Sequence, residues 1–234
     1  FRHMTHSFNG GGVYSARHGE IFATKHFTDP SYEGAGLVAG YDIRTGARRI
    51  VSGRFPEPGG GYTMFGSGFE SVRAVGVLRH EATTLPGAWD LEQAANGQLY
   101  VWGSRVGNQE ITRVDPDSGL RTLVWKQALE GDTAAPEYGQ CYSTRPKSTF
   151  FGGFVPVQLE DHAFAMGPDG SFYLGFRNDN AEGNGIAKIS PNGATCTIVS
   201  RWNGTMGEVG TGVSPQYSNL EGFLVRDGKL WATL

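Results

Sequence analysis

Short segments of alternating apolar and polar residues recur along the chain, and glycine-containing turns separate them. This period of two residues predicts half-buried β-strands rather than helices. In the clearest cases an apolar segment, a glycine turn and an aromatic-rich segment follow one another. Asn-Gly and Asp-Gly pairs at these turns favour tight hairpins, because both central residues of a type I′ turn need positive φ. Four hairpins are therefore predicted, over residues 13–24, 90–101, 163–174 and 222–232.

A second predicted hairpin follows each of the first three. These hairpins lie at residues 41–50, 111–123 and 187–198, and each consists of a strand, a polar turn with a glycine, and another strand. Four antiparallel strands in each repeat are typical of the blades of a β-propeller. The predicted fold class is therefore all-β: a β-propeller of four-stranded antiparallel blades, with about three blades plus the first hairpin of a fourth in this chain.

The predicted organisation is a single propeller domain over residues 1–234 that is incomplete by itself. Insertions as long as those between its blades are usually lids, contact surfaces or disordered segments. Propellers close with at least four blades, and an open arc exposes unpaired strand edges. Additional polypeptide or further subunits are therefore expected to close the ring. The blades are expected at roughly residues 8–54, 88–126, 159–202 and 219–234, with long insertions at 55–87 and 130–158.

Composition and charge narrow the range of partners. The chain has 36 Gly in 234 residues, but 14 Phe, 9 Tyr and 5 Trp argue against a disordered or collagen-like chain. It carries 20 basic and 23 acidic side chains, so no general positive field attracts nucleic acid. Glycine and proline interrupt every long apolar stretch, so no membrane span is predicted. We expect a folded protein that binds a small molecule or a carbohydrate.

The two cysteines leave one structural question open. Cys141 and Cys196 allow a single disulfide, but their separation in space does not follow from the sequence. Neither cysteine lies in a Cys-x-x-Cys pair or close to a histidine, so zinc binding is less favoured than a bridge or two plain thiols. We expect an extracellular or periplasmic location.

Two segments resemble a known group of proteins. Residues 111–119, Ile-Thr-Arg-Val-Asp-Pro-Asp-Ser-Gly, look like the recurrent strand pair of six-bladed β-propellers, and residues 164–173 look like their inner hairpin. This superfamily includes NHL-repeat proteins, the regucalcin and gluconolactonase family, and strictosidine-synthase-like proteins. The resemblance covers essentially the whole chain, and it is specific for the fold but says little about function.

Residues just before each inner strand gather around the channel mouth of a propeller, and several of them carry oxygen donors here. Asp90, Asp161, Asn219 and Glu221 are the candidates for a cation site. Carboxylate and amide oxygens suit Ca²⁺ or another divalent cation. In the gluconolactonase-like proteins a glutamate followed by glycine binds the metal, and the resemblance implies this role for Glu221. Alternatively, these side chains cap strand ends or bind loop amides.

The same region contains candidate catalytic and substrate-binding residues. His162 titrates near neutral pH and could act with Asp161 as a general base, or it is simply hydrogen-bonded or exposed to solvent. Trp89, Trp102 and Arg177 are the candidates for substrate contact, although aromatic side chains also pack blade interiors. The sequence thus suggests a metal-assisted hydrolase or lyase of a small ester, lactone or sugar derivative. The alternative is a non-catalytic propeller that binds a glycan or a protein through its loops.

Overall fold

The structure is a computed structural model of residues 1–234. The chain divides into two compact units, residues 1–106 with 110–123, and residues 107–109 with 124–234. Within the described part of the chain, every regular element is a β-strand. The described residues are 11–26, 36–56, 62–66, 85, 87–105, 108–127, 142–146, 154–156, 159–178, 183–202, 209–211, 220 and 222–233.

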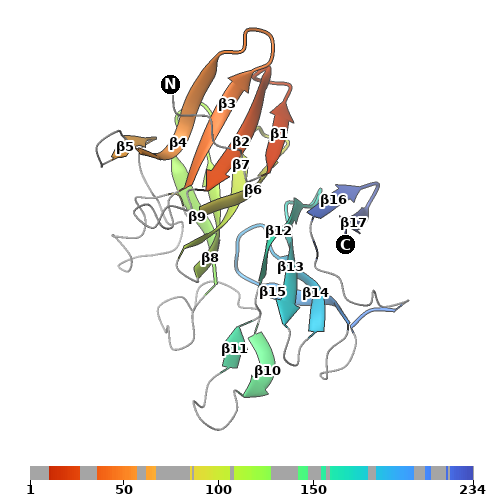
Figure 1. The fold of residues 1–234 in the computed structure, drawn as a ribbon. Coiled ribbons are helices and arrows are strands. Elements are labelled where there is room, and N and C mark those ends of the chain that lie inside the picture. Colours follow the sequence, from red (N-terminus) through yellow and green to blue (C-terminus); the bar gives the residue numbers. More distant parts are fainter. Residues whose placement is uncertain are drawn as a thin grey trace. The chain divides into compact units, whose positions relative to one another are not determined.

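The strands form antiparallel sheets in which neighbours along the chain are neighbours in space (Figure 1). The first sheet has five strands in sequence order: β1 (Gly12–Ser15), β2 (Glu20–His26), β3 (Gly36–Asp42), β4 (Arg48–Pro56) and β5 (Tyr62–Phe65). The second sheet has four: β6 (Gly87–Gln93), β7 (Leu99–Arg105), β8 (Asn108–Val114) and β9 (Arg121–Lys126).

The remaining strands follow the same plan. A two-stranded sheet contains β10 (Tyr142–Pro146) and β11 (Phe154–Pro156). A four-stranded sheet contains β12 (Leu159–Met166), β13 (Phe172–Asn178), β14 (Gly183–Ile189) and β15 (Cys196–Trp202). The final hairpin contains β16 (Gly222–Arg226) and β17 (Lys229–Thr233). The prediction of an all-β protein with four-stranded antiparallel sheets is confirmed.

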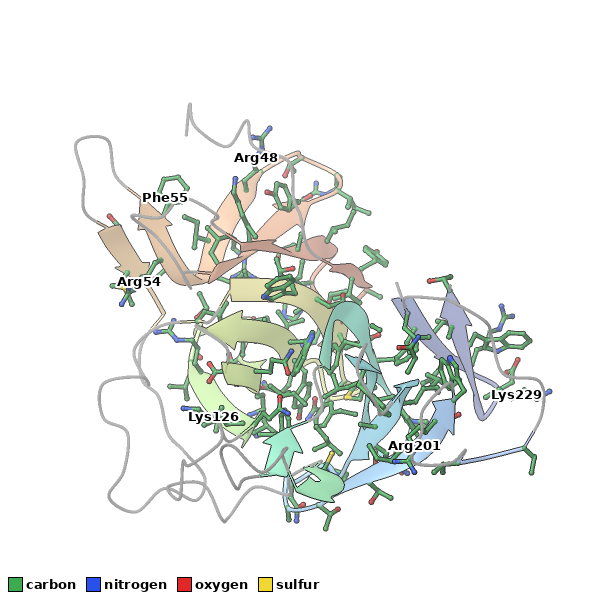
Figure 2. The ribbon with its side chains drawn as sticks, turned by 60° about the horizontal axis from the view of Figure 1, so that its bottom comes forward. Arg48, Arg54, Phe55, Lys126, Arg201 and Lys229 are labelled. Carbon is green, nitrogen blue, oxygen red and sulfur yellow. The ribbon has the colours of Figure 1, made fainter. Side chains whose placement is uncertain are left out.

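The first sheet differs from the other blades by its additional strand. Strand β4 is nine residues long, with Arg48 at one end and Arg54 and Phe55 near the other (Figure 2). Arg54 lies opposite Met64 of β5, so the second half of β4 pairs with β5. The fifth strand therefore covers the outer edge of the first blade and satisfies backbone groups that would otherwise be exposed there.

The turns between the third and fourth strands of the first two blades share one design. Asp42 Oδ1 accepts hydrogen bonds from the backbone N–H groups of Arg44 and Thr45, and Asp115 Oδ1 accepts the equivalent bonds from Asp117 and Ser118. Each turn ends on a glycine with φ 71°. An aspartate whose side chain binds the following amides, and a glycine that tolerates positive φ, thus specify this turn from local sequence alone.

A hydrophobic core fills the first unit between its two sheets. Phe22 of β2 is completely buried there, and burial of a side chain of this size contributes about 1.5 to 3 kcal/mol. A bidentate ion pair between Arg49 and Glu20, with an N–O distance of 2.7 Å, lies beside this core, and Arg49 also donates to the carbonyl of Pro116. The buried members of the core are Phe22, Val38, Val51, Leu85, Ala88, Leu91, Leu99, Val101 and Val114.

The second unit has its own packed interior. Phe164 and Phe172 stack with a centroid distance of 6.0 Å, and both are 1% exposed. A separate cluster of Ala163, Trp202 and Leu220 packs against Phe223 of β16. The last hairpin is therefore attached to the preceding blade through one of its faces.

Cys196 at the start of β15 is in a disulfide. The sequence contains one other cysteine, Cys141, which lies outside the described residues. Such bonds persist in oxidising compartments. In the part of the chain that the structure describes, no helix has the length and apolar character needed to cross a membrane.

Candidate functional site

Two carboxyl side chains lie on one face of β6, the first strand of the second blade. Asp90 and Glu92 belong to β6 and are two residues apart, so strand alternation directs both to the same side of the sheet. Both are partly buried. Among the described residues, no basic side chain forms an ion pair with either carboxyl group. This pair is the strongest candidate for a functional site in the described structure.

Burial changes the acidity of both groups. Loss of solvation raises the pKa of Asp90 to about 7, although a hydrogen bond from the Leu91 amide opposes this shift. Burial also raises the pKa of Glu92 to about 7, and the neighbouring Asp90 charge adds to the effect. Two interacting carboxyl groups of this kind release their protons in two successive steps, because ionisation of one disfavours ionisation of the other. Near neutral pH the pair therefore holds both an acid and a base.

Gly11 makes room for the Asp90 carboxyl group. Its N–H donates to the carbonyl of Trp89 at 2.9 Å, and its carbonyl accepts from the Thr24 amide at 3.1 Å, so the backbone fixes Gly11 between β2 and β6. A Cβ atom at Gly11 would overlap Asp90 Oδ1. Because Gly11 has no side chain, the Asp90 carboxyl group can occupy this position.

The described side chains on the predicted list are those of Trp89, Asp90 and Trp102. Trp102 lies opposite Asp90 in the register of β6 and β7 and is 1% exposed, so it packs within the sheet in this structure. Trp89 precedes Asp90 on β6. Their predicted contacts with substrate stay predictions.

The other predicted site residues have side chains that lie outside the described part of the structure. Asp161 and His162 belong to β12 and Arg177 to β13, but their side chains lie outside the described residues, as do Asn219 and Glu221. In the part that is described, no group of three His, Cys, Asp or Glu side chains could hold a metal ion. The catalytic and metal-binding roles of these residues stay predictions.

Glu92 was not among the residues that the sequence pattern indicated. The signal was present, because a carboxylate two residues after Asp90 in a predicted strand must share its face. The predicted site residues were those at the start of each expected inner strand, which was residue 90 here, whereas β6 spans Gly87–Gln93 and contains both Asp90 and Glu92. The raised pKa could not have been predicted, because it depends on burial by other segments.

A second group of polar side chains forms a hydrogen-bond network between the first two blades. Ser15 Oγ lies 2.9 Å from His18 Nδ1, and His18 Nε2 lies 3.1 Å from Asp117 Oδ1. Gln93 Nε2 donates to Ser15 Oγ at 3.0 Å. These residue types resemble a nucleophilic triad, but Ser15 is 0% exposed and its hydroxyl is held by Gln93 and His18. A substrate cannot reach it, so the network is structural.

Comparisons with known proteins give only distant similarities. No protein-family model and no curated protein matches the sequence. An exo-β-1,3-galactanase from Phanerochaete chrysosporium, solved with galactose, is 13% identical over 94% of this chain and 40% of its own, with a TM-score of 0.45. A GH43 β-1,3-galactosidase bound to galactodeoxynojirimycin is 11% identical over 80% of this chain and 55% of its own, with a TM-score of 0.43.

A third similar structure is named for a different activity. A putative 6-phosphogluconolactonase from Bacteroides fragilis is 13% identical over 96% of this chain and 76% of its own, with a TM-score of 0.31. The chain thus spans about half or less of the two galactan-related structures. Folds are shared by proteins of unrelated function, so similarity this weak says nothing about the substrate of this chain.

Proposed function

We propose that this chain is part of a hydrolase that cleaves a sugar derivative, with Glu92 as its general acid and Asp90 as its general base. The observation that carries the proposal is the pair of partly buried carboxyl groups on β6, each with a pKa of about 7. Groups with such perturbed acidity concentrate at catalytic sites. General acid and base catalysis is most efficient when the pKa lies near the working pH.

The surroundings of the two groups assign their roles. The Leu91 amide donates to Asp90 Oδ1 at 2.8 Å, which favours the ionised form of Asp90. The Asp90 charge in turn raises the pKa of Glu92 and favours its protonated form. Asp90 is therefore the general base, and Glu92 is the general acid.

The reaction that follows is hydrolysis at a carbon bearing a leaving oxygen. Asp90 accepts a proton from water while the water oxygen attacks that carbon. Glu92 donates its proton to the leaving oxygen as the carbon–oxygen bond breaks. The pair then holds its proton on Asp90, and transfer of this proton back to Glu92 completes the cycle.

Galactosides and sugar lactones are the test compounds, because the similar structures include a galactanase, a galactosidase and a putative lactonase. The disulfide at Cys196 fits an extracellular or periplasmic enzyme. In this proposal Trp89, which precedes Asp90 on β6, contributes a substrate contact.

The proposal is tested by assaying a panel of nitrophenyl galactosides, galacto-oligosaccharides and aldonolactones. Asp90→Asn and Glu92→Gln are each expected to lower kcat/KM about 100-fold or more, and the parent pH profile is expected to be bell-shaped near pH 7. Asp227→Asn is the matched control, since Asp227 is exposed with φ 53°, which asparagine tolerates. Turnover that survives both β6 substitutions contradicts the proposal.

Two further arms separate positioning and metal effects. Gly11→Ala displaces the Asp90 carboxyl group and should lower kcat. Gly12→Ala is the control, because its Cβ would lie 3.2 Å from the Phe22 carbonyl oxygen, a tight contact that needs a shift of only a few tenths of an ångström and does not involve Asp90. EDTA tests the calcium site that the sequence analysis predicted. Activity and melting temperature that both fall with EDTA, and recover with Ca²⁺, support a metal. Insensitivity of both rejects it.

A further inference from the structure

Two hydrogen bonds tie strand β6 to the first blade. Among the described strands, β6 pairs with β7 along one of its edges. On its other side the carbonyl oxygen of Trp89 accepts a hydrogen bond from the Gly11 N–H at 2.9 Å. Further along the strand, Gln93 Nε2 donates to Ser15 Oγ at 3.0 Å. The position of β6 relative to the first blade is therefore fixed at two points.

These two points flank the acid and the base. Trp89 directly precedes Asp90 on β6, and Gln93 directly follows the second carboxyl residue, Glu92. Adjacent residues of a strand point to opposite faces, so Gln93 shares its face with the core residue Leu91 and not with Glu92. Gln93 therefore acts on the backbone that carries Glu92 rather than on the reacting atoms.

The contact at Gln93 belongs to a hydrogen-bond network with one direction. Gln93 also donates to the Gly97 carbonyl at 3.1 Å, and a carbonyl only accepts, so this bond fixes which amide atom is the nitrogen. Ser15 Oγ accepts from that nitrogen and donates its own hydrogen to His18 Nδ1, 2.9 Å away. The neutral His18 ring then carries its proton on Nε2 and donates it to Asp117 Oδ1 at 3.1 Å. Each donor of this network has an acceptor.

The inner part of the network is shielded from water. Ser15 is 0% exposed, and the His18 side chain is 11% exposed and lies edge-on to the buried Phe22 ring at 5.5 Å. Asp117, at the outer end, is 62% exposed. Removing one partner of a shielded hydrogen bond leaves the other partner unpaired, whereas an exposed ion pair contributes little. The bond between Ser15 and Gln93 is therefore the firm part of the network.

We propose that Gln93 is a positioning residue that holds Glu92 in place through its hydrogen bond to Ser15. This inference rests on the proposed function, because it gives the network a role in the same reaction. A displacement of about 1 Å at a reacting group can change a rate about 100-fold. Partial burial also keeps the pKa of Glu92 raised, and a loosened end of β6 would admit water and lower that pKa.

Steady-state kinetics of Gln93→Met tests the proposal with a substrate that the parent cleaves. Methionine keeps the length of the side chain but cannot donate to Ser15. We expect kcat to fall about tenfold with KM little changed, because the contact serves alignment and not binding. The basic limb of the pH profile should move to lower pH, since Glu92 must be protonated to act as the acid. A purely structural role would lower the melting temperature and leave the pH profile unchanged.

Two further variants show whether the effect passes through this one contact. Gln98→Met is the matched control, because Gln98 lies in the same hairpin and its amide donates to Asp115 Oδ2 at 2.8 Å, away from Ser15. It should leave kcat unchanged. Ser15→Ala removes the contact from the other side, and combining it with Gln93→Met should cost little more in kcat than either change alone. Losses that multiply in the double variant overturn the proposal.

NMR titration of the Glu92 carboxyl carbon separates this proposal from the hydrolase activity. A pKa that falls in Gln93→Met and in Ser15→Ala, but not in Gln98→Met, supports the positioning role even if the parent cleaves none of the test compounds. That lack of cleavage would overturn only the proposed function. If the parent is active, an unchanged kcat and pH profile in Gln93→Met overturns the positioning role and leaves the proposed function standing. A Glu92 pKa that is the same in the parent and both variants overturns it as well.

Discussion

At the scale of single residues, burial rather than residue type gives Asp90 and Glu92 their chemistry. Aspartates in open turns of the same chain behave in the opposite way. Hydrogen bonds from Gln98 and the Ser118 amide lower the pKa of Asp115 to about 2, and Lys188 followed by the Ser171 amide lowers that of Asp169 to about 2. One residue type thus covers the pKa range from about 2 to about 7 in one fold.

The raised pKa values predict how stability depends on pH. In the unfolded chain Asp90 and Glu92 ionise near pH 3.8 and 4.5, but in the folded chain both ionise near pH 7. Above pH 4 the unfolded state therefore releases protons that the folded state retains. Their contribution to the free energy of unfolding is largest below pH 4 and is lost as the pH rises to about 7.

Urea unfolding between pH 4 and pH 8 measures this effect. Asp90→Asn or Glu92→Gln should each reduce the fall in unfolding free energy over this range by roughly 1 to 4 kcal/mol. Asp169→Asn is the control, because the lowered pKa of Asp169 affects stability only below about pH 4, and its exposed pair with Lys188 contributes about 0 to 1 kcal/mol. An unchanged slope in both β6 variants would show that the two carboxyls ionise normally.

At the scale of elements, one turn recurs with different neighbours. Gly46, Gly119 and Gly193 end the turns between third and fourth strands, with φ of 71°, 71° and 69°. A Cβ at Gly119 would overlap the carbonyl oxygen of Val51 in β4, and one at Gly193 would overlap that of Val124 in β9. A Cβ at Gly46 would meet nothing within 4 Å. The turn of one blade thus packs on the fourth strand of the blade before it.

Alanine substitutions at these glycines separate backbone strain from packing. Gly46→Ala should cost only the strain of positive φ, about 1 to 2 kcal/mol. Gly119→Ala, in the same unit, should cost roughly 1 to 3 kcal/mol more, because its methyl group also displaces β4. Denaturant unfolding of the first unit measures the difference. Equal losses for the two variants would mean that the close approach of Gly119 to Val51 is absent.

At the scale of the whole molecule, the disulfide at Cys196 restrains a chain that has only two cysteines. Thiol titration of the unreduced protein in guanidinium chloride should find no free thiol, and two after reduction. Reduction should destabilise the unit of residues 107–109 and 124–234 by about 2 to 4 kcal/mol and leave the other unit unchanged. Two thiols in the unreduced protein would contradict the bridge.

Local sequence determined the strands, the turns and the blade pattern of this protein. Alternation of side chains and the glycine turns are short-range properties, because strand geometry repeats every two residues and positive φ is a cost of the single residue. The sharing of one face by Asp90 and Glu92 is also a short-range property, readable from their spacing in β6.

The tertiary structure alone decided what surrounds the individual side chains. Gly11 is 79 positions from Asp90 in the sequence, yet its missing side chain makes the space for the carboxyl group. His18 and Asp117 are 99 positions apart and meet only because two blades pack together. Ile21 and Leu99 have equivalent places in their hairpins, but one is 42% exposed and the other is 0% exposed. Solvation and long-range contacts arise from packing between blades. Neither the raised pKa of Asp90 nor the exposure of Ile21 therefore follows from any local pattern.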